Sequence, residues 1–211
     1  MATDTSRVGI MEFRAAATEN QVRADEYGNQ TFSQSLPPLA DLARNRKIFG
    51  HNSGTNAGVA PVAAVPTTAA QFYLFNSSET LSIIILSAYQ WLIGGTTGLG
   101  SSMWGTLSLA EESTAPTAIT SGVTGSMATG ATAAGLLDTA VTLGTASLWN
   151  CLSIKDTLAV DAIGPGHRVD FNGEYVIPPK MGFGLGMVDE SGTSPKYGAG
   201  FTWAEVKLTY S

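Results

Sequence analysis

From residue 71 to the C-terminus, the chain consists of short strand-like runs separated by Gly, Asn, Asp and Pro, with no helical segment between them. This spacing excludes the alternating strand and helix pattern of a parallel sheet. It predicts an all-β fold, a single antiparallel β-sandwich with the jelly roll as the favoured topology. The ten runs are Gln71–Phe75, Thr80–Gln90, Ser102–Ala110, Leu136–Leu143, Ser147–Ile154, Thr157–Ile163, Arg168–Phe171, Tyr175–Ile177, Met181–Val188 and Ala199–Tyr210.

Charged residues are scarce and unevenly placed. They make up 13% of the 211 residues, and residues 51–211 hold only eleven acids and five bases, about 10% of that range, which is low for a domain that must solvate its whole surface. The first 50 residues hold six acids and six bases, so the net charge of −6 lies entirely in residues 51–211. We interpret this as surface reserved for copies of the chain or for a partner. The acidic balance argues against nucleic acid as that partner, because such binding depends on clustered Lys and Arg.

Residues 1–69 differ from the remainder and are predicted to form an extended N-terminal arm, followed by the sandwich body at 70–211. The arm has mixed charge and weak apolar periodicity. A helix over Arg14–Tyr27 and a short helix over Pro38–Ile48, stopped by Gly50, fit its pattern. We expect a neighbouring subunit to order the arm, and a partly disordered tail is the alternative.

One predicted strand, Met181–Val188, alternates large apolar residues with Gly182, Gly184 and Gly186. One face of this strand then supplies core, and the other is bare backbone that something can approach closely. The opposite sheet, a partner subunit or a crossing loop would each fit, so we take the three glycines as candidate partner contacts. The segment Ser113–Gly135, in which 19 of 23 residues are Ala, Gly, Ser or Thr, is predicted to be a long loop or a flat strand against a neighbour.

No residue pattern predicts catalysis, a cofactor or a metal. His51 and His167 lack a partner at metal-ligand spacing and are interpreted as surface or turn residues, and no nucleophile elbow supports a hydrolytic triad. Cys151, the single cysteine, excludes an intrachain disulfide and is interpreted as a small core residue. The four tryptophans lie in apolar runs, so we expect them in the core rather than on sugars.

The ends and the apolar runs of the chain predict a soluble protein made in a cytoplasm. The N-terminus lacks the basic start and apolar core of a signal peptide. The longest apolar stretch, Leu81–Ile93, contains Ser82, Ser87 and Gln90 and is too short to cross a bilayer. We therefore expect no membrane partner.

The order of several segments along the chain carries information about its family. Tyr27–Phe32 and Val65–Asn76 precede the run Glu79–Leu86, and Val169–Pro179 precedes the Trp-x-Glu ending of Gly200–Val206. In this order the segments resemble a family of tailed-bacteriophage virion proteins, in which an arm leads into the first strands and similar strands close the fold. The resemblance spans 27–35 and 65–211 and does not extend to 36–64.

The resemblance implies a β-sandwich or jelly roll that serves as a capsid cement (decoration) protein. Such a protein is typically a homotrimer on the capsid surface that clamps neighbouring major capsid proteins, and it would be made in the host cytoplasm. In that reading, Arg44, Arg46 and Lys47 of the arm are candidates for contact with an acidic capsid surface. A tail or head-fibre component that recognises host glycans through Ser113–Gly135 is the alternative, and a carbohydrate-binding β-sandwich module or enzyme is the second.

Overall fold

The structure is a computed structural model of the whole chain. It describes residues 10–15, 18–23, 39–52, 58–96, 100–108, 125–126, 132–143, 148–156, 166–171, 173–189 and 194–208. The chain divides into two compact units, Met1–Asp41 and Leu42–Ser211, which are described separately.

The N-terminal unit contains an antiparallel hairpin rather than a helix. Its strands are β1 (Ile10–Ala15) and β2 (Thr18–Arg23), and Arg14 stands opposite Glu19. The helix predicted over Arg14–Tyr27 is therefore wrong as far as Arg23. An isolated two-stranded hairpin is marginally stable in water. The expectation that a neighbour orders this segment stays a prediction.

A short helix, α1 (Ala40–Arg44), lies within the predicted Pro38–Ile48 but ends earlier. Arg46 adopts a left-handed conformation with φ of 57°. Its N–H donates to the Ala43 carbonyl at 3.0 Å, and the Lys47 N–H donates to the Leu42 carbonyl at 2.9 Å. This pair of hydrogen bonds is the Schellman ending of a helix, so Arg46 ends α1 and Gly50 does not.

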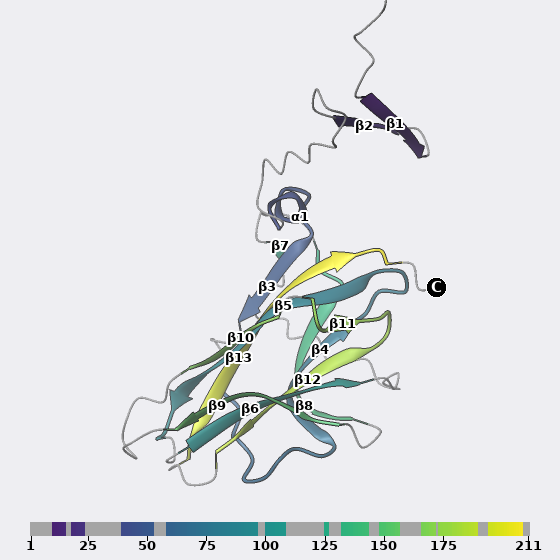
Figure 1. The fold of residues 1–211 in the computed structure, drawn as a ribbon. Coiled ribbons are helices and arrows are strands. Elements are labelled where there is room, and N and C mark those ends of the chain that lie inside the picture. The colour runs from purple at the N-terminus through teal and green to yellow at the C-terminus, as the bar shows by residue number, and fades with distance from the viewer. Residues whose placement is uncertain are drawn as a thin grey trace, which may run out of the picture. The chain divides into compact units, whose positions relative to one another are not determined.

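The second unit contains two antiparallel sheets (Figure 1). The first sheet runs in the order β10 (His167–Asp170), β5 (Ser82–Gly94), β13 (Lys196–Val206), β3 (Ile48–Asn52) and β7 (Gly125–Ser126), with β11 (Val176–Ile177) also on β5. The second runs in the order β8 (Gly135–Thr142), β4 (Ala69–Asn76), β12 (Gly182–Val188), β6 (Gly100–Ser108) and β9 (Asn150–Asp156).

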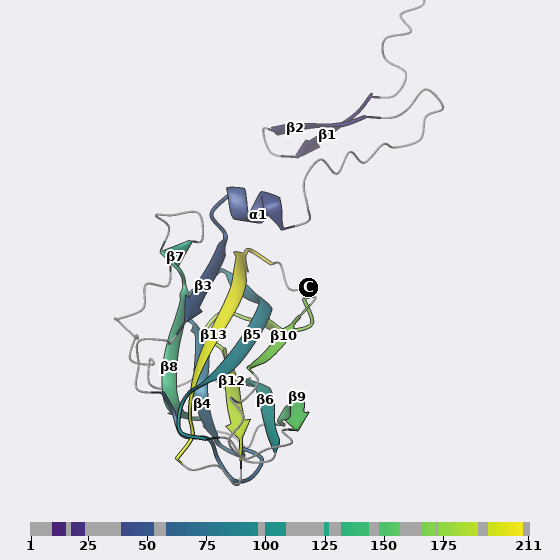
Figure 2. The same ribbon diagram turned by 90° about the vertical axis from the view of Figure 1, so that its left-hand side faces the viewer.

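The strand order is that of a jelly roll. The chain passes between the sheets from β3 to β4, β5 and β6, and again from β9 to β10, β12 and β13. This winding yields the neighbours β3-β13-β5-β10 in one sheet and β4-β12-β6-β9 in the other, packed face to face (Figure 2). The predicted all-β antiparallel sandwich is confirmed. The strands β7 and β8 lie within the connection from β6 to β9 and extend each sheet by one strand.

The first jelly-roll strand, β3, falls inside the range that the sequence assigned to the arm. β3 pairs with β13, where Phe49 stands opposite Trp203. The sheet therefore begins before residue 69. Only Ile48 and Phe49 are large apolar residues in this strand, and Gly50, His51 and Asn52 resemble a turn. The predicted strand 157–163 and most of the predicted loop 113–135 lie outside the described residues.

The core between the sheets is built from a few aromatic rings among smaller side chains. Trp203 is fully buried and stacks on Phe49 with ring centroids 6.1 Å apart. Phe183 meets Phe201 edge to face at 6.2 Å. Of the four tryptophans, Trp203 alone belongs to this core; Trp91, Trp104 and Trp149 are half-buried, which corrects the expectation that all four are core residues.

Candidate functional site

The basic candidates stand at the start of the sandwich. Arg46 and Lys47 are exposed, whereas the side chain of Arg44 on α1 lies outside those described. The Lys47 carbonyl accepts a hydrogen bond from the Glu205 N–H at 2.9 Å, which fixes this backbone to β13. The two exposed side chains are available to a partner surface, and their contact with a capsid stays a prediction.

The glycine face of β12 is covered by the chain itself. All three glycines are buried. A Cβ at Gly182 would overlap the ring of Tyr73, a Cβ at Gly184 would lie 3.0 Å from the Cβ of Ala70, and one at Gly186 would lie 2.6 Å from Pro66 Cγ. The bare backbone therefore admits side chains from this chain, and we correct the expectation that Gly182, Gly184 and Gly186 are free to meet a partner.

Glycines covered by aromatic rings also occur on the outer face of the first sheet. A Cβ at Gly198 would lie 2.6 Å from the Trp91 ring, and one at Gly200 would overlap the ring of Tyr89. The rings of Tyr89 and Trp91 stack at 5.9 Å. Aromatic rings thus lie over glycine on both outer faces. The sequence signal for this second case, Gly198-Ala-Gly200, was missed.

Replacing these glycines by alanine should destabilise the protein, and the loss should be larger where an added Cβ lies closer to its neighbours. We expect Gly182→Ala to lower the free energy of unfolding by about 3 kcal/mol, because the ring of Tyr73 is buried and cannot turn away. Gly184→Ala should cost about 1 kcal/mol. Gly94→Ala is the matched control, since a Cβ there meets nothing within 4 Å. Urea unfolding of the three variants measures the order, and equal losses would contradict it.

The outer face of the second sheet carries exposed apolar side chains. Ile154 of β9 is 68% exposed, and Leu148, just before β9, is 89% exposed. Cys151 of β9 is exposed as well, which corrects its interpretation as a core residue. The three central strands β4, β12 and β6 contain no charged residue. This face thus differs from the first sheet, where the exposed Arg168 and Asp170 form an ion pair at 3.0 Å.

A buried polar cluster surrounds His167. Its Nε2 lies 2.9 Å from Ser101 Oγ and its Nδ1 lies 3.1 Å from Ser153 Oγ, with the histidine only 1% exposed. Burial, and then the positive charge of Lys155, lower the pKa of His167 from 6.5 to about 4. The ring is therefore neutral at pH 7. The sequence placed His167 in an exposed turn, and the structure corrects this.

The serine, histidine and serine of this cluster have the connectivity of a nucleophile, a base and an orienting group. Ser101 is nevertheless 6% exposed, and its hydroxyl faces the interior between the sheets. A substrate cannot approach a nucleophile enclosed in this way. The arrangement thus supports a structural link and not acyl transfer.

Two further buried polar groups lie on the inner face of the first sheet. Gln90, opposite His167 in register, is 1% exposed, and neither its Oε1 nor its Nε2 has a hydrogen-bond partner among the described residues. His51 is 4% exposed, its Nε2 has no such partner, and burial lowers its pKa. His51 was interpreted as a surface residue, which the structure corrects.

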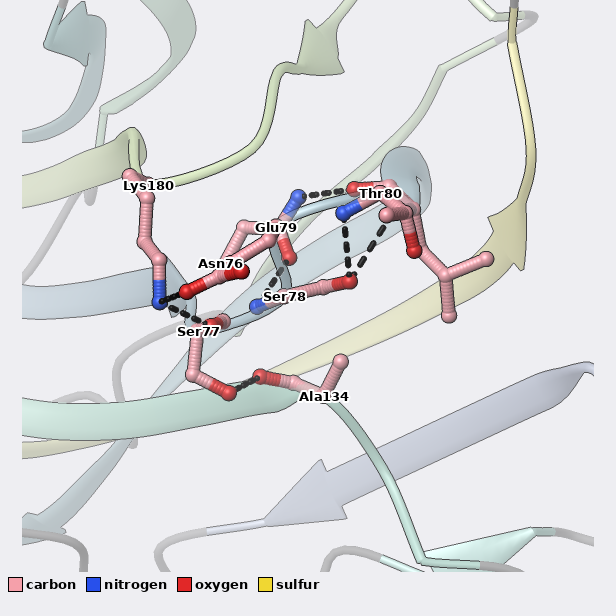
Figure 3. Close-up of polar contacts among 8 residues, drawn as sticks. Asn76, Ser77, Ser78, Glu79, Thr80, Ala134 and Lys180 are labelled. Carbon is pink, nitrogen blue, oxygen red and sulfur yellow. Dashed lines mark hydrogen bonds and ion pairs between the residues drawn. The ribbon is translucent and has the colours of Figure 1, made fainter.

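The turn from β4 to β5 is fixed by Asn76 (Figure 3). Asn76 is fully buried, and its Nδ2 donates to the carbonyls of Leu81 at 2.7 Å, Pro178 at 3.0 Å and Ile177 at 3.2 Å. Its Oδ1 accepts from the Ser78 N–H at 3.1 Å. Because Ile177 belongs to the first sheet and Asn76 to the second, this side chain joins the sheets. This role of Asn76 was not predicted from the sequence.

Beside Asn76, a second layer of hydrogen bonds holds the turn (Figure 3). Ser77 Oγ donates to the Ala134 carbonyl at 2.7 Å, just before β8. Lys180 Nζ donates to the Ser77 carbonyl at 2.7 Å and lies 3.9 Å from Glu79. All these contacts serve the corner itself, so we assign it no ligand.

Metal and membrane candidates are absent from the part of the chain that the structure describes. There, no three His, Cys, Asp or Glu side chains gather in a way that could hold a metal ion. No helix among those residues is long and apolar enough to span a bilayer.

Comparison with known proteins gives no match to a family model, a curated protein or a solved structure.

Proposed function

We propose that the chain is a non-enzymatic virion structural protein, a capsid cement or decoration protein that clamps neighbouring major capsid proteins as a homotrimer. The observation that carries this proposal is the pair of exposed apolar side chains Ile154 and Leu148, in and just before β9, the edge strand of the second sheet. Exposed apolar surface of this kind marks protein contact.

The division of the chain adds support. A separate N-terminal unit, Met1–Asp41, precedes the sandwich and suits an arm that reaches a neighbour. Contacts of an arm and a body on different subunits combine into strong retention, even where each contact is weak. The exposed Arg46 and Lys47 follow this unit directly and would meet acidic groups of the capsid.

The test is binding of the full chain to purified capsids that lack it, with occupancy measured by cryo-electron microscopy. We expect near-complete occupancy for the full chain, and at least a tenfold loss for a variant without residues 1–41 and for the double variant Leu148→Asp, Ile154→Asp. This deletion leaves the sheet intact, since β3 begins at Ile48.

Ile93→Asp is the matched control, because Ile93 is 39% exposed and lies beside Gly198 on the other sheet. It should bind as the unchanged chain does. Failure of the full chain to bind capsids would refute the cement function, and unchanged occupancy without residues 1–41 would refute the clamp.

A further inference from the structure

The cluster around His167 joins the two sheets at one edge of the sandwich. His167 belongs to β10 of the first sheet, whereas Ser101 and Ser153 belong to β6 and β9 of the second. Figures 1 and 2 both show β9 beside β10 at this edge. Since both ring nitrogens take part in hydrogen bonds, the imidazole is a polar link between the sheets and not merely a packing element.

We propose that His167 is an acid-sensitive latch: the neutral ring holds β10 against β6 and β9, and its protonation opens this edge while the rest of the sandwich stays folded. This inference is independent of the proposed function, because it concerns only the edge formed by these three strands.

The neutral ring suits its partners. A neutral imidazole donates from one nitrogen and accepts at the other, and a serine hydroxyl can do either, so both contacts are satisfied together. A protonated ring would place a positive charge in the same buried position. Such a charge is costly unless a nearby group compensates it.

Among the described side chains, the strands around the ring supply no charge that could compensate it. On β10 itself the carboxylate of Asp170 is exposed and already pairs with Arg168. On β9, Lys155 has the same sign as the protonated ring, and its Nζ donates to the Gly166 carbonyl. The side chain of Asp156 lies outside those described. β6 has no titratable residue, and on β5 Tyr89 lies on the outer face over Gly200, opposite Arg168 in register. Gln90 is uncharged and cannot neutralise the ring.

The direction of the pH effect follows from the pKa of His167, which is about 4 in the closed edge and 6.5 when the ring is in water. The open edge binds the proton more tightly, so the closed edge is fully favoured above pH 6.5 and loses stability as the pH falls toward 4. Between pH 7.5 and pH 5.0, these two values increase the opening equilibrium constant about 30-fold.

Hydrogen exchange of the full chain, followed by mass spectrometry and corrected for the intrinsic effect of pH, tests the latch. We expect amides of β9 and β10 to lose protection about 30-fold from pH 7.5 to pH 5.0. Amides of β4 and β8, at the far edge, should change less than threefold. Equal loss at both edges would overturn the latch, because it would show global loosening.

Two variants distinguish the pH response caused by His167 from one caused by His51, the chain's only other histidine. His167→Gln cannot be protonated, so the pH response of β9 and β10 should disappear, whereas His51→Gln should keep it. A response that survives in His167→Gln would overturn the proposal. If that variant does not fold, titration of the His167 ring in the unchanged chain by NMR decides instead. A ring pKa near 4 supports the latch, and one near 6.5 overturns it.

Discussion

Asn76→Asp is expected to lower the free energy of unfolding by about 5 kcal/mol at pH 8. The substitution keeps the size of the side chain and replaces the Nδ2 donor by an oxygen. Three carbonyl groups, those of Leu81, Ile177 and Pro178, then lose their hydrogen bond and face a buried negative charge. Urea unfolding at pH 8 measures the loss.

The pH dependence of this variant identifies the cause. A protonated aspartic acid can donate one hydrogen bond, so the difference from the unchanged chain should shrink as the pH falls through the range where buried carboxyls titrate. Ser78→Ala in the same turn is the control. It removes an acceptor for the Thr80 and Leu81 N–H groups and should cost about 1 kcal/mol. A loss below about 2 kcal/mol for Asn76→Asp would contradict the role assigned to Asn76.

The strands of the body were predictable because alternation and turn residues are local signals. Met181–Val188 alternates large residues with glycine, and the structure places β12 there with Phe183 and Leu185 in the core. β3 was not predictable in the same way. Its inner face carries Phe49 and His51, and only pairing with β13 shows that these positions are buried.

The polar positions were misread for a related reason. A sequence shows which residues share a face of a strand, but not what covers that face. His167 follows Gly-Pro-Gly and so resembled a turn residue, yet β10 brings its ring between the sheets. Cys151 lies in an apolar run, yet β9 places it on the outer face.

The glycine-rich strands β12 and β13 show that side chains of the same chain can cover a bare strand face. The sequence left open what approaches the bare face of β12, and Tyr73, Pro66 and Trp149 fill it. Large rings on the outer faces thus replace the side chains that the glycines lack. Charged residues are scarce in part because aromatic rings and other apolar side chains of the same chain cover the outer faces of the sheets. They are scarce also because some exposed positions, such as Leu148, are apolar.

Glu205→Ala should lower the free energy of unfolding by about 4 kcal/mol. Glu205 is 5% exposed, and its Oε1 accepts from the N–H groups of Ala134 and Gly135 at 2.8 and 3.0 Å and from Trp203 Nε1 at 3.0 Å. Removal of this oxygen leaves three donors without a partner where water cannot readily reach them. It also breaks the link between β13 of one sheet and β8 of the other.

Glu205→Gln is the informative comparison, since all three hydrogen bonds end on one oxygen that an amide carbonyl can replace. We expect it to cost about 1 kcal/mol, because a neutral acceptor is weaker than a carboxylate but leaves no donor unpaired. Guanidinium unfolding of both variants, followed by tryptophan fluorescence, gives the two losses. If Glu205→Gln were as destabilising as Glu205→Ala, the charge would matter more than the acceptor. We expect the acceptor to matter more, because all three donors converge on Oε1.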